Sequence, residues 1–250
     1  MLRDYARAWA YYTRVLRELL FPRHCVVCGN VIDNGYLCAE CRKGYLLQKY
    51  IRYNPREEYL AGQAEPLAQD VLKSVLLLYK YDGIVKDALH EVKFNDATAL
   101  LPLLREEAEA ALPSAKLRWL SQYDVITCVP TSPERRARRG YDVPDEIFAS
   151  LLEQRGGEFQ PELLERVRST APLFELQPLE RRQELAGCFA LAPRTHKLVV
   201  GKRILLCDDI YTTGSTMAEA AKVLLTAGAK EVHGLALAAS SYHWEEACTL

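Results

Sequence analysis

Residues 203–229 read RILLCDDIYTTGSTMAEAAKVLLTAGA, and this stretch decides the fold. The apolar run 204–207 is typical of a parallel strand that is buried on both faces. Two acids and a turn rich in Thr, Gly and Ser follow it, and an alanine-rich helix is expected over 215–227. Residues 231–238 are predicted to form the next parallel strand. The order strand, turn, helix, strand predicts an α/β protein with a ligand site at the carboxyl end of the first strand.

The turn and the acids predict a sugar phosphate as the ligand. The turn consists of Thr212, Thr213, Gly214, Ser215 and Thr216. Its hydroxyl groups and the free amides of the helix N-terminus are suited to a phosphate, and the glycine allows a close approach of the backbone. Asp208 and Asp209 can accept hydrogen bonds from ribose hydroxyls or hold a Mg²⁺-bound water. The alternative is an ordinary strand–turn–helix with two solvated acids.

Composition sets broad limits. The chain has 250 residues, 49% of them hydrophobic, which predicts one medium domain with an ample core plus a small module. The net charge of −1 predicts no general attraction to nucleic acid, although a local basic patch remains compatible with it. No apolar run approaches the roughly 20 residues that span a bilayer, and residues 1–17 lack the apolar core of a signal peptide. We therefore expect a cytoplasmic protein without membrane insertion.

Four cysteines near the N-terminus predict a structural zinc site. Two Cys-x-x-Cys pairs bring together Cys25, Cys28, Cys38 and Cys41. Each pair places two thiolates on one tight turn, and two pairs complete a tetrahedral S₄ site with no open position for catalysis. A disulfide alternative does not suit a reducing compartment. The module is too short for a core, so Zn²⁺ is expected to supply about 10 kcal/mol of its folding free energy. His24 is a less favoured substitute ligand.

Periodicity and composition divide the chain into five parts. We expect an amphipathic helix over 1–22, the Cys₄ module over 23–45 and a polar linker over 46–73. The α/β domain then occupies 74–240, and 241–250 is a tail. Within the α/β domain, strands are predicted at 74–81 and 123–129, and helices at 84–94, 99–112 and 143–154. Alternating strands and helices imply a mostly parallel sheet flanked by helices.

A basic stretch follows the strand that ends near residue 129. Residues 131–141 read TSPERRARRGY, with four arginines in five positions at the carboxyl end of a strand. Arginine pairs bidentately with phosphate oxygens, so this stretch is a candidate second phosphate site. The candidate ligands are Thr131, Ser132, Arg135, Arg136, Arg138 and Arg139. The alternative is a solvated basic loop. A further basic stretch at 166–172 and 180–184 is expected to be a flap over the ligand, a nucleic-acid surface, or exposed helix charges.

Residues 205–217 resemble the signature of the type I phosphoribosyltransferases, which bind phosphoribosyl pyrophosphate (PRPP). The resemblance implies that Asp208 and Asp209 contact the ribose hydroxyls and that residues 212–216 hold the 5′-phosphate. It also implies that Mg²⁺ accompanies the ligand. Under this reading, the candidates at 131–139 serve the pyrophosphate. The expected fold is that of a type I phosphoribosyltransferase with a small N-terminal zinc-binding module.

Several motifs, in order, narrow this resemblance to the ComF family, which is associated with DNA uptake by competent bacteria. They are FPxxCxxCG from 21, YxG at 81, Lys93–Phe94, VPxxxxRRxxRGY from 129, RVRxTxP from 166, and ERR at 180. The family usually reads RGFNQ and TPPQ where this chain has RGYDV from 139 and TAPL from 170. It also often has a second cysteine set, which 45–65 lacks.

Two classes of function follow from the resemblance. In the first, the chain is a phosphoribosyltransferase with Asp208 and Asp209 as catalytic residues, Asp209 being a candidate general base. Its acceptor is unidentified, and nucleotide salvage is one version of this class. In the second, the chain senses PRPP or binds single-stranded DNA without turnover. The resemblance implies DNA-uptake proteins as partners. It also implies a possible homodimer, because proteins of this fold commonly form dimers.

Overall fold

The structure is a computed structural model that describes residues 20, 22–33, 35–45, 51–53, 66–112, 120–154, 156–169 and 183–240. The chain divides into two compact units, Met1–Gln48 and Lys49–Leu250. Apart from residues 20 and 22, the helix expected at 1–22 lies outside the described residues, and so does the tail 241–250. None of the helices in the described ranges has the length and apolar composition needed to cross a bilayer.

The described part of the first unit consists mainly of a small hairpin followed by a helix. Strands β1 (Arg23–His24) and β2 (Val31–Ile32) pair antiparallel, and helix α2 spans Ala39–Tyr45. The first cysteine pair lies in the hairpin turn, where the Cys25 amide donates to the Asn30 carbonyl at 2.7 Å. Gly29 adopts a φ of 72°, a conformation that suits glycine. The turn therefore folds back tightly enough to place both thiols on one side.

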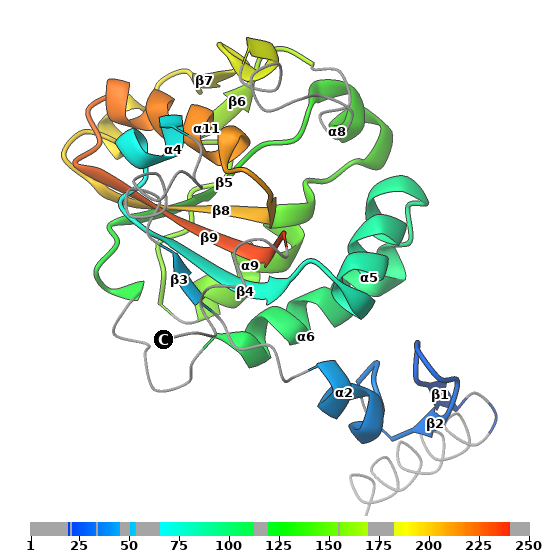
Figure 1. The fold of residues 1–250 in the computed structure, drawn as a ribbon. Helices are drawn as coiled ribbons and strands as arrows, with labels where there is room; N and C mark the ends of the chain where they lie inside the picture. The colour runs from blue at the N-terminus through cyan, green and yellow to red at the C-terminus, as the bar shows by residue number, and fades with distance from the viewer. Residues whose placement is uncertain are drawn as a thin grey trace, which may run out of the picture. The chain divides into compact units, whose positions relative to one another are not determined.

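The second unit is built on a five-stranded sheet (Figure 1). Its order is β3 (Ile51–Tyr53), β4 (Val75–Lys80), β9 (Glu231–Ala239), β8 (Arg203–Tyr211) and β5 (Val125–Cys128). Strand β3 is antiparallel to β4, whereas the other four strands run parallel. Strands β8 and β9 are almost completely buried, as expected for a parallel sheet covered on both faces. The mostly parallel sheet is therefore confirmed.

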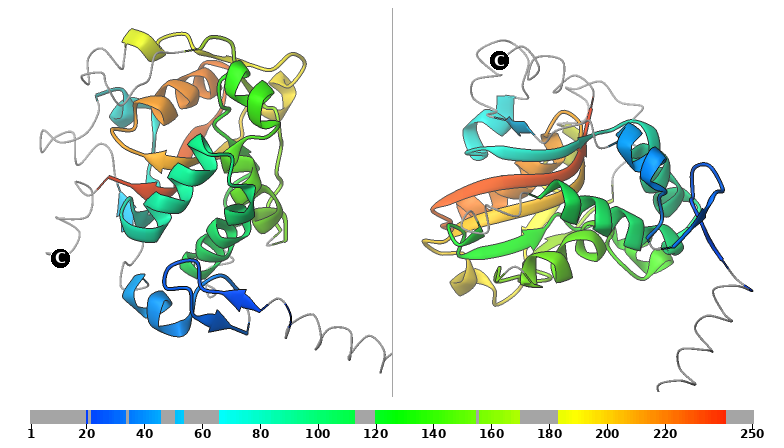
Figure 2. Two further views of the ribbon diagram at one scale, coloured as in Figure 1. Left: turned by 90° about the vertical axis from the view of Figure 1, so that its right-hand side faces the viewer. Right: turned by 90° about the horizontal axis from the view of Figure 1, so that it is seen from below.

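Helices cover both faces of this sheet. Helix α11 (Ser215–Thr226) and the short α4 (Pro66–Val71) pack together on one face. Helices α9 (Val143–Gln154) and α6 (Leu101–Ala111) cover the other face, and α5 (Gly83–Phe94) packs on α6. Figure 2 shows these layers from two further sides.

The predicted helices at 84–94 and 143–154 are confirmed, and 99–112 divides into a 3₁₀ turn (Thr98–Leu100) and α6. Helix α5 begins one residue earlier than predicted, at Gly83, and the Asp82 carboxylate caps it by accepting from the Gly83 amide at 2.8 Å. The expected linker 46–73 includes β3 and α4. Two short strands, β6 (Leu164–Arg166) and β7 (Phe189–Leu191), form an unexpected separate pair, and a 3₁₀ turn spans His196–Leu198.

The strand that carries the acid pair is longer than predicted. Asp208 and Asp209 lie inside β8 rather than after it, because β8 pairs with β9 as far as Tyr211 opposite Ala239. On its other side, β8 pairs with β5 only as far as Cys207. The acids therefore lie on a segment of β8 that has lost its β5 neighbour, and a pocket opens there.

Candidate functional site

A pocket of about 460 Å³ lies at the carboxyl ends of β8 and β5. Its walls come from β8, the turn before α11, the segment after β5, and α5. The charged and hydroxyl-bearing residues that line it are Tyr81, Lys93, Thr131, Arg135, Arg139, Arg166, Asp208, Asp209, Thr212 and Thr216. The fold thus gathers residues more than 130 positions apart in the sequence around one cavity.

The acid pair is almost fully buried and already partnered. Asp208 is 9% exposed and Asp209 is 7% exposed. The Asp209 amide donates to Asp208 Oδ1 at 2.8 Å, and Lys93 Nζ lies 2.7 Å from Asp209 Oδ1. Burial, and then the neighbouring Asp209 charge, raise the pKa of Asp208 to about 8, although Lys93 and Arg166 oppose the shift. A pKa of about 8 favours the protonated form of Asp208 at pH 7, beside the Asp209 side chain that pairs with Lys93.

In the turn before α11, some hydroxyl groups line the pocket and others form hydrogen bonds within the turn. Thr212 and Thr216 line the pocket. Thr213 Oγ1 lies 2.8 Å from Ser215 Oγ and also accepts from the Ser215 amide at 3.4 Å, so these two hydroxyls hold the turn. Gly214 has a φ of 85°, and a Cβ there would lie 2.6 Å from Cζ of Tyr211. Glycine is thus required both by backbone conformation and by space.

The basic stretch is a helix, α8 (Pro133–Arg139), and not a loop. Two of its four arginines line the pocket, and the other two pair with acids outside the pocket lining. Arg135 and Arg139 line the pocket. Arg136 instead pairs with Asp142 at 3.2 Å and with Glu162 at 2.8 Å. Arg138 lies 4.0 Å from Asp96 and donates to the Lys93 carbonyl at 3.4 Å. Only half of the arginine cluster therefore faces the cavity.

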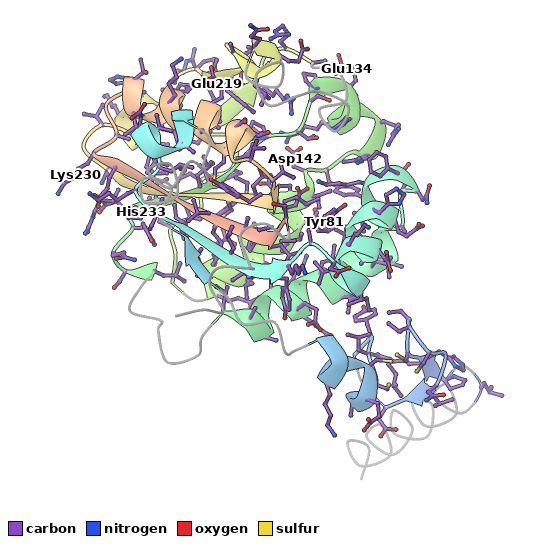
Figure 3. All side chains as sticks on the ribbon, viewed as in Figure 1. Tyr81, Glu134, Asp142, Glu219, Lys230 and His233 are labelled. Atoms are coloured by element: carbon purple, nitrogen blue, oxygen red, sulfur yellow. The ribbon has the colours of Figure 1, made fainter. Side chains whose placement is uncertain are left out.

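The start of this segment is held by a buried acid. Thr131 lines the pocket, whereas Ser132 is buried at the N-terminus of α8. The Asp142 carboxylate accepts from the Thr131 amide at 3.1 Å and pairs with Arg136. Burial raises the pKa of Asp142. Figure 3 shows Asp142 and Tyr81 at the pocket end of the sheet, and His233 and Lys230 at the opposite end. Asp142, one of the departures from the ComF motifs, thus fixes the backbone of this segment.

Sequence reasoning did not place Lys93 in the pocket, and it offered the stretch that begins at Arg166 beside the ligand only as one of three alternatives. Lys93 is on the last turn of α5 and reaches Asp209, while its carbonyl accepts from the Arg139 guanidinium. Arg166 ends β6, where its guanidinium carbon lies 5.5 Å above the Phe189 ring, and burial lowers its pKa. The only sequence signals were the short motifs around 93 and 166, because the contacts depend on how helices and strands far apart in the chain pack.

The four cysteines form a compact cluster in the first unit. The Sγ atoms of Cys25, Cys28, Cys38 and Cys41 all lie within 4.8 Å of one another, and Cys28 Sγ is 3.7 Å from Cys38 Sγ. Tetrahedral zinc with bonds of about 2.3 Å requires sulfurs about 3.8 Å apart, so the set fits structural Zn²⁺. His24 is not part of this set of clustered ligand atoms, and its Nδ1 donates to the Gly29 carbonyl at 2.8 Å.

Magnesium fits the acid pair only with a ligand present. Among the described residues, the cysteine set is the one group of three or more metal-ligating side chains. Two carboxylates offer hard oxygen atoms, but Mg²⁺ usually completes its shell with substrate phosphates and water. The residues that would hold it are Asp208 and Asp209, together with oxygens of a bound phosphate ligand.

The fold and the pocket define a phosphoribosyltransferase-type domain accompanied by a zinc ribbon. Comparison with known families agrees: residues 154–246 match the Phosphoribosyl transferase domain and residues 16–50 match the Double zinc ribbon domain. Competence protein F of Haemophilus influenzae is 32% identical over 231 residues, which is 87% of this chain and 97% of that protein. The chain belongs to the ComF family.

Two further relatives match over shorter stretches. Competence protein ComFC of Streptococcus pneumoniae is 30% identical over 160 residues, 64% of this chain and 66% of that one. DNA utilization protein YhgH of Salmonella typhimurium is 34% identical over 148 residues, 58% of this chain. This match spans 62% of the length of YhgH.

Proposed function

We propose that this pocket binds PRPP with Mg²⁺ and that the chain transfers the phosphoribosyl group to an acceptor. The observation that carries the proposal is the convergence of three kinds of group around one cavity. These groups are the buried acid pair of β8, two hydroxyls at the start of α11, and arginines from α8 and β6. A ribose with a phosphate at one end and a pyrophosphate at the other needs such a set of partners.

Each part of the pocket has a role in this proposal. Asp208 and Asp209 accept hydrogen bonds from the ribose hydroxyls. Thr212, Thr216 and the amides at the start of α11 hold the 5′-phosphate, since a helix N-terminus favours anions. Arg135 and Arg139, with Thr131, take the pyrophosphate. Magnesium would neutralise part of the pyrophosphate charge as it leaves.

The reaction requires little covalent participation by the protein. The bond from ribose C1 to the pyrophosphate oxygen breaks, and the oxygen keeps the electron pair. A new bond forms from C1 to an acceptor nitrogen, which loses its proton. The ribose passes through a cation-like state, so arginines placed beside the departing pyrophosphate lower the barrier electrostatically. Asp209 is the candidate base for the acceptor proton.

We place this activity in DNA uptake or use. The ComF-family relatives carry names that refer to competence and to DNA utilization. Proteins of a DNA-uptake machine are therefore the proposed partners. Single-stranded DNA is a second candidate ligand, favoured by the exposed arginines on the outer side of α8. A shift assay across salt concentrations tests it, because phosphate contacts weaken steeply as salt rises.

The activity is tested by following pyrophosphate release. The full chain is incubated with PRPP, Mg²⁺ and a panel of purine and pyrimidine bases, beside the D208N/D209N double variant. Release that depends on a base and is lost in the double variant supports the transferase. Saturable binding without release would replace it by a PRPP sensor. No binding of PRPP to the folded wild type would sink the proposal.

A further inference from the structure

Arg166 reaches the pocket from a part of the fold that lies outside the main sheet. It ends β6, and β6 pairs with β7 in a separate two-stranded sheet of three residue pairs. Two such short strands are at best marginally stable in isolation, so contacts with the rest of the domain must hold them in place. The position of the Arg166 guanidinium in the pocket therefore depends on how the β6–β7 pair is attached.

Glu219 of α11 makes a buried polar contact with this pair. It is 6% exposed, and its Oε1 accepts from the Gly187 amide at 2.9 Å (Figure 3). Gly187 lies two residues before β7 and has a φ of 69°, a conformation that suits glycine. A carboxylate is costly to bury unless it accepts hydrogen bonds. The contact therefore holds the acid and the turn at Gly187 together.

The path from this turn to Arg166 is short. Cys188, the next residue after Gly187, accepts at its carbonyl from the Val167 amide at 2.8 Å. Phe189 then lies opposite Arg166 in the strand register, and its ring lies under the guanidinium. Cys188 and Phe189 also belong to the hydrophobic core to which α11 contributes. A shift of the turn would therefore reach Arg166 through neighbouring backbone and side-chain contacts.

The helix that carries Glu219 begins at the turn that lines the pocket. Ser215 is the first residue of α11, Thr216 lines the pocket, and Glu219 follows one helical turn after Ser215. Glu219 itself is not among the residues that line the pocket. It thus connects, through one helix, the hydroxyl-rich turn on one side of the cavity with the strand pair that supplies Arg166 on another.

We propose that Glu219 is a positioning residue, which holds Arg166 at a fixed place relative to the turn before α11 through the Gly187 amide. This inference rests on the proposed function, in which the turn holds the 5′-phosphate and Arg166 is among the arginines that face the charged ligand. A ligand with phosphates at both ends binds tightly only when both sets of partners keep their spacing, so a contact that fixes this spacing contributes to affinity.

Calorimetry with Mg²⁺ measures the PRPP affinity of the full chain for three substitutions at Glu219. Glu219→Gln keeps an oxygen at the same reach and is expected to keep affinity within about twofold. Glu219→Asp keeps the charge but withdraws the carboxylate by one methylene, and Glu219→Ala removes the acceptor. Both are expected to weaken PRPP binding by about 5- to 10-fold. Lys222→Ala, at an exposed position of α11, is the matched control and leaves affinity unchanged.

A double-mutant cycle with Arg166→Gln separates positioning from a general structural defect. If Glu219 acts through Arg166, Glu219→Ala weakens binding in the wild-type background, but by less than about twofold in the Arg166→Gln background. A general defect would weaken binding equally in both backgrounds. Hydrogen exchange of the Gly187 amide in the ligand-free protein is a second readout. Exchange is expected to be slow in wild type and Glu219→Gln, and faster in Glu219→Asp and Glu219→Ala.

The outcomes separate this inference from the proposed function. Additive losses in the cycle, or wild-type affinity in Glu219→Ala, would overturn the positioning role and leave PRPP binding in place. A loss in Glu219→Gln as large as that in Glu219→Ala, or fast exchange of the Gly187 amide in wild type, would also overturn it. PRPP binding without base-dependent pyrophosphate release would remove the proposed transfer and leave the positioning role standing. A folded wild type that binds no PRPP would remove both.

Discussion

Two strand ends meet in the pocket, and they present polar groups in different ways. After β8, a tight turn of small residues leads into α11, and a required glycine holds its shape. After β5, the charged helix α8 follows, and two of its four arginines form ion pairs with neighbouring acids. The difference teaches that the backbone geometry of a tight turn fixes the positions of its polar groups. In a cluster of like charges, contacts with residues far away in the sequence decide which side chains face the pocket.

The largest loss of PRPP affinity is expected at the carboxyl end of β8, from the substitution Asp209→Asn. The amide keeps the size of the side chain but loses the charge, and it leaves the Lys93 ammonium without its carboxylate. PRPP affinity is expected to fall on the order of 100-fold, about 3 kcal/mol, measured by calorimetry with Mg²⁺. Asp70→Asn, an exposed acid on α4, is the control and keeps wild-type affinity. Equal affinity in both variants would remove Asp209 from the binding site.

Two glycines with the same backbone conformation allow the strand ends to be compared directly. Gly214 and Gly140 have φ values of 85° and 83°. A Cβ at Gly214 would collide with the Tyr211 ring, whereas a Cβ at Gly140 would meet nothing within 4 Å. Gly214→Ala is therefore expected to lower the free energy of unfolding by about 2–3 kcal/mol, and Gly140→Ala by about 1 kcal/mol. Urea unfolding measures both free energies. Similar losses of stability in the two variants would contradict the conclusion that the turn before α11 requires glycine because of its close contact with Tyr211.

At the β5 end, neighbouring arginines provide the comparison. Arg139 lines the pocket, and Arg138 does not. Arg139→Ala is expected to weaken PRPP binding by about 10- to 30-fold, roughly 1.5–2 kcal/mol, because a charged hydrogen-bond donor is lost. Arg138→Ala should change it by less than about twofold, since exposed ion pairs contribute little. Calorimetry measures PRPP affinity in both variants. Equal losses of affinity would mean that all four arginines attract the ligand through their combined charge, and that Arg139 makes no specific contact.

The pH dependence concerns Asp208, whose pKa of about 8 lies well above the ordinary carboxyl range. In the proposed complex the ribose hydroxyls donate to this side chain, and its ionised form is the stronger acceptor, so binding below pH 8 is coupled to the loss of a proton. PRPP affinity should therefore increase on the order of tenfold between pH 7 and pH 9, as the carboxyl ionises. Dissociation constants at pH 7, 8 and 9 test this, with Asp208→Asn as the variant that should lose the slope.

The smallest effect is expected from Asp142→Asn, which introduces the asparagine of the ComF motif RGFNQ at this position. Asp142→Asn keeps an oxygen for the Thr131 amide, loses the Arg136 pair, and removes the cost of burying a charge. Unfolding free energy should change by less than about 1 kcal/mol. Asp142→Ala removes the acceptor as well and should cost about 2 kcal/mol. Urea unfolding compares the two, and an equal loss would show that charge, not the accepted hydrogen bond, holds this segment.

The sequence predicted what depends on local order along the chain. The buried strands, the helices at 84–94 and 143–154, and the compact cysteine set follow from periodicity, turn residues and spacing. The length of β8 did not follow, because its pairing partner β9 continues past the acids. The sequence likewise did not predict which arginines of α8 face away from the pocket, because that depends on ion pairs with Asp142, Glu162 and Asp96. It did not predict the contact of Lys93 with Asp209 either, because that depends on how α5 packs.

Lys93 balances charge at the acid pair of the pocket. Its ammonium compensates Asp209, Asp208 holds a proton at neutral pH, and the Lys93 carbonyl accepts from Arg139. The acid pair and its lysine therefore carry almost no net charge before any ligand arrives. Under the proposed function, binding of a magnesium–pyrophosphate ligand would be an exchange of partners rather than an addition of charge. Lys93 and the Asp208 proton would give way to the metal and the phosphates, so we expect the site to favour a ligand that brings both.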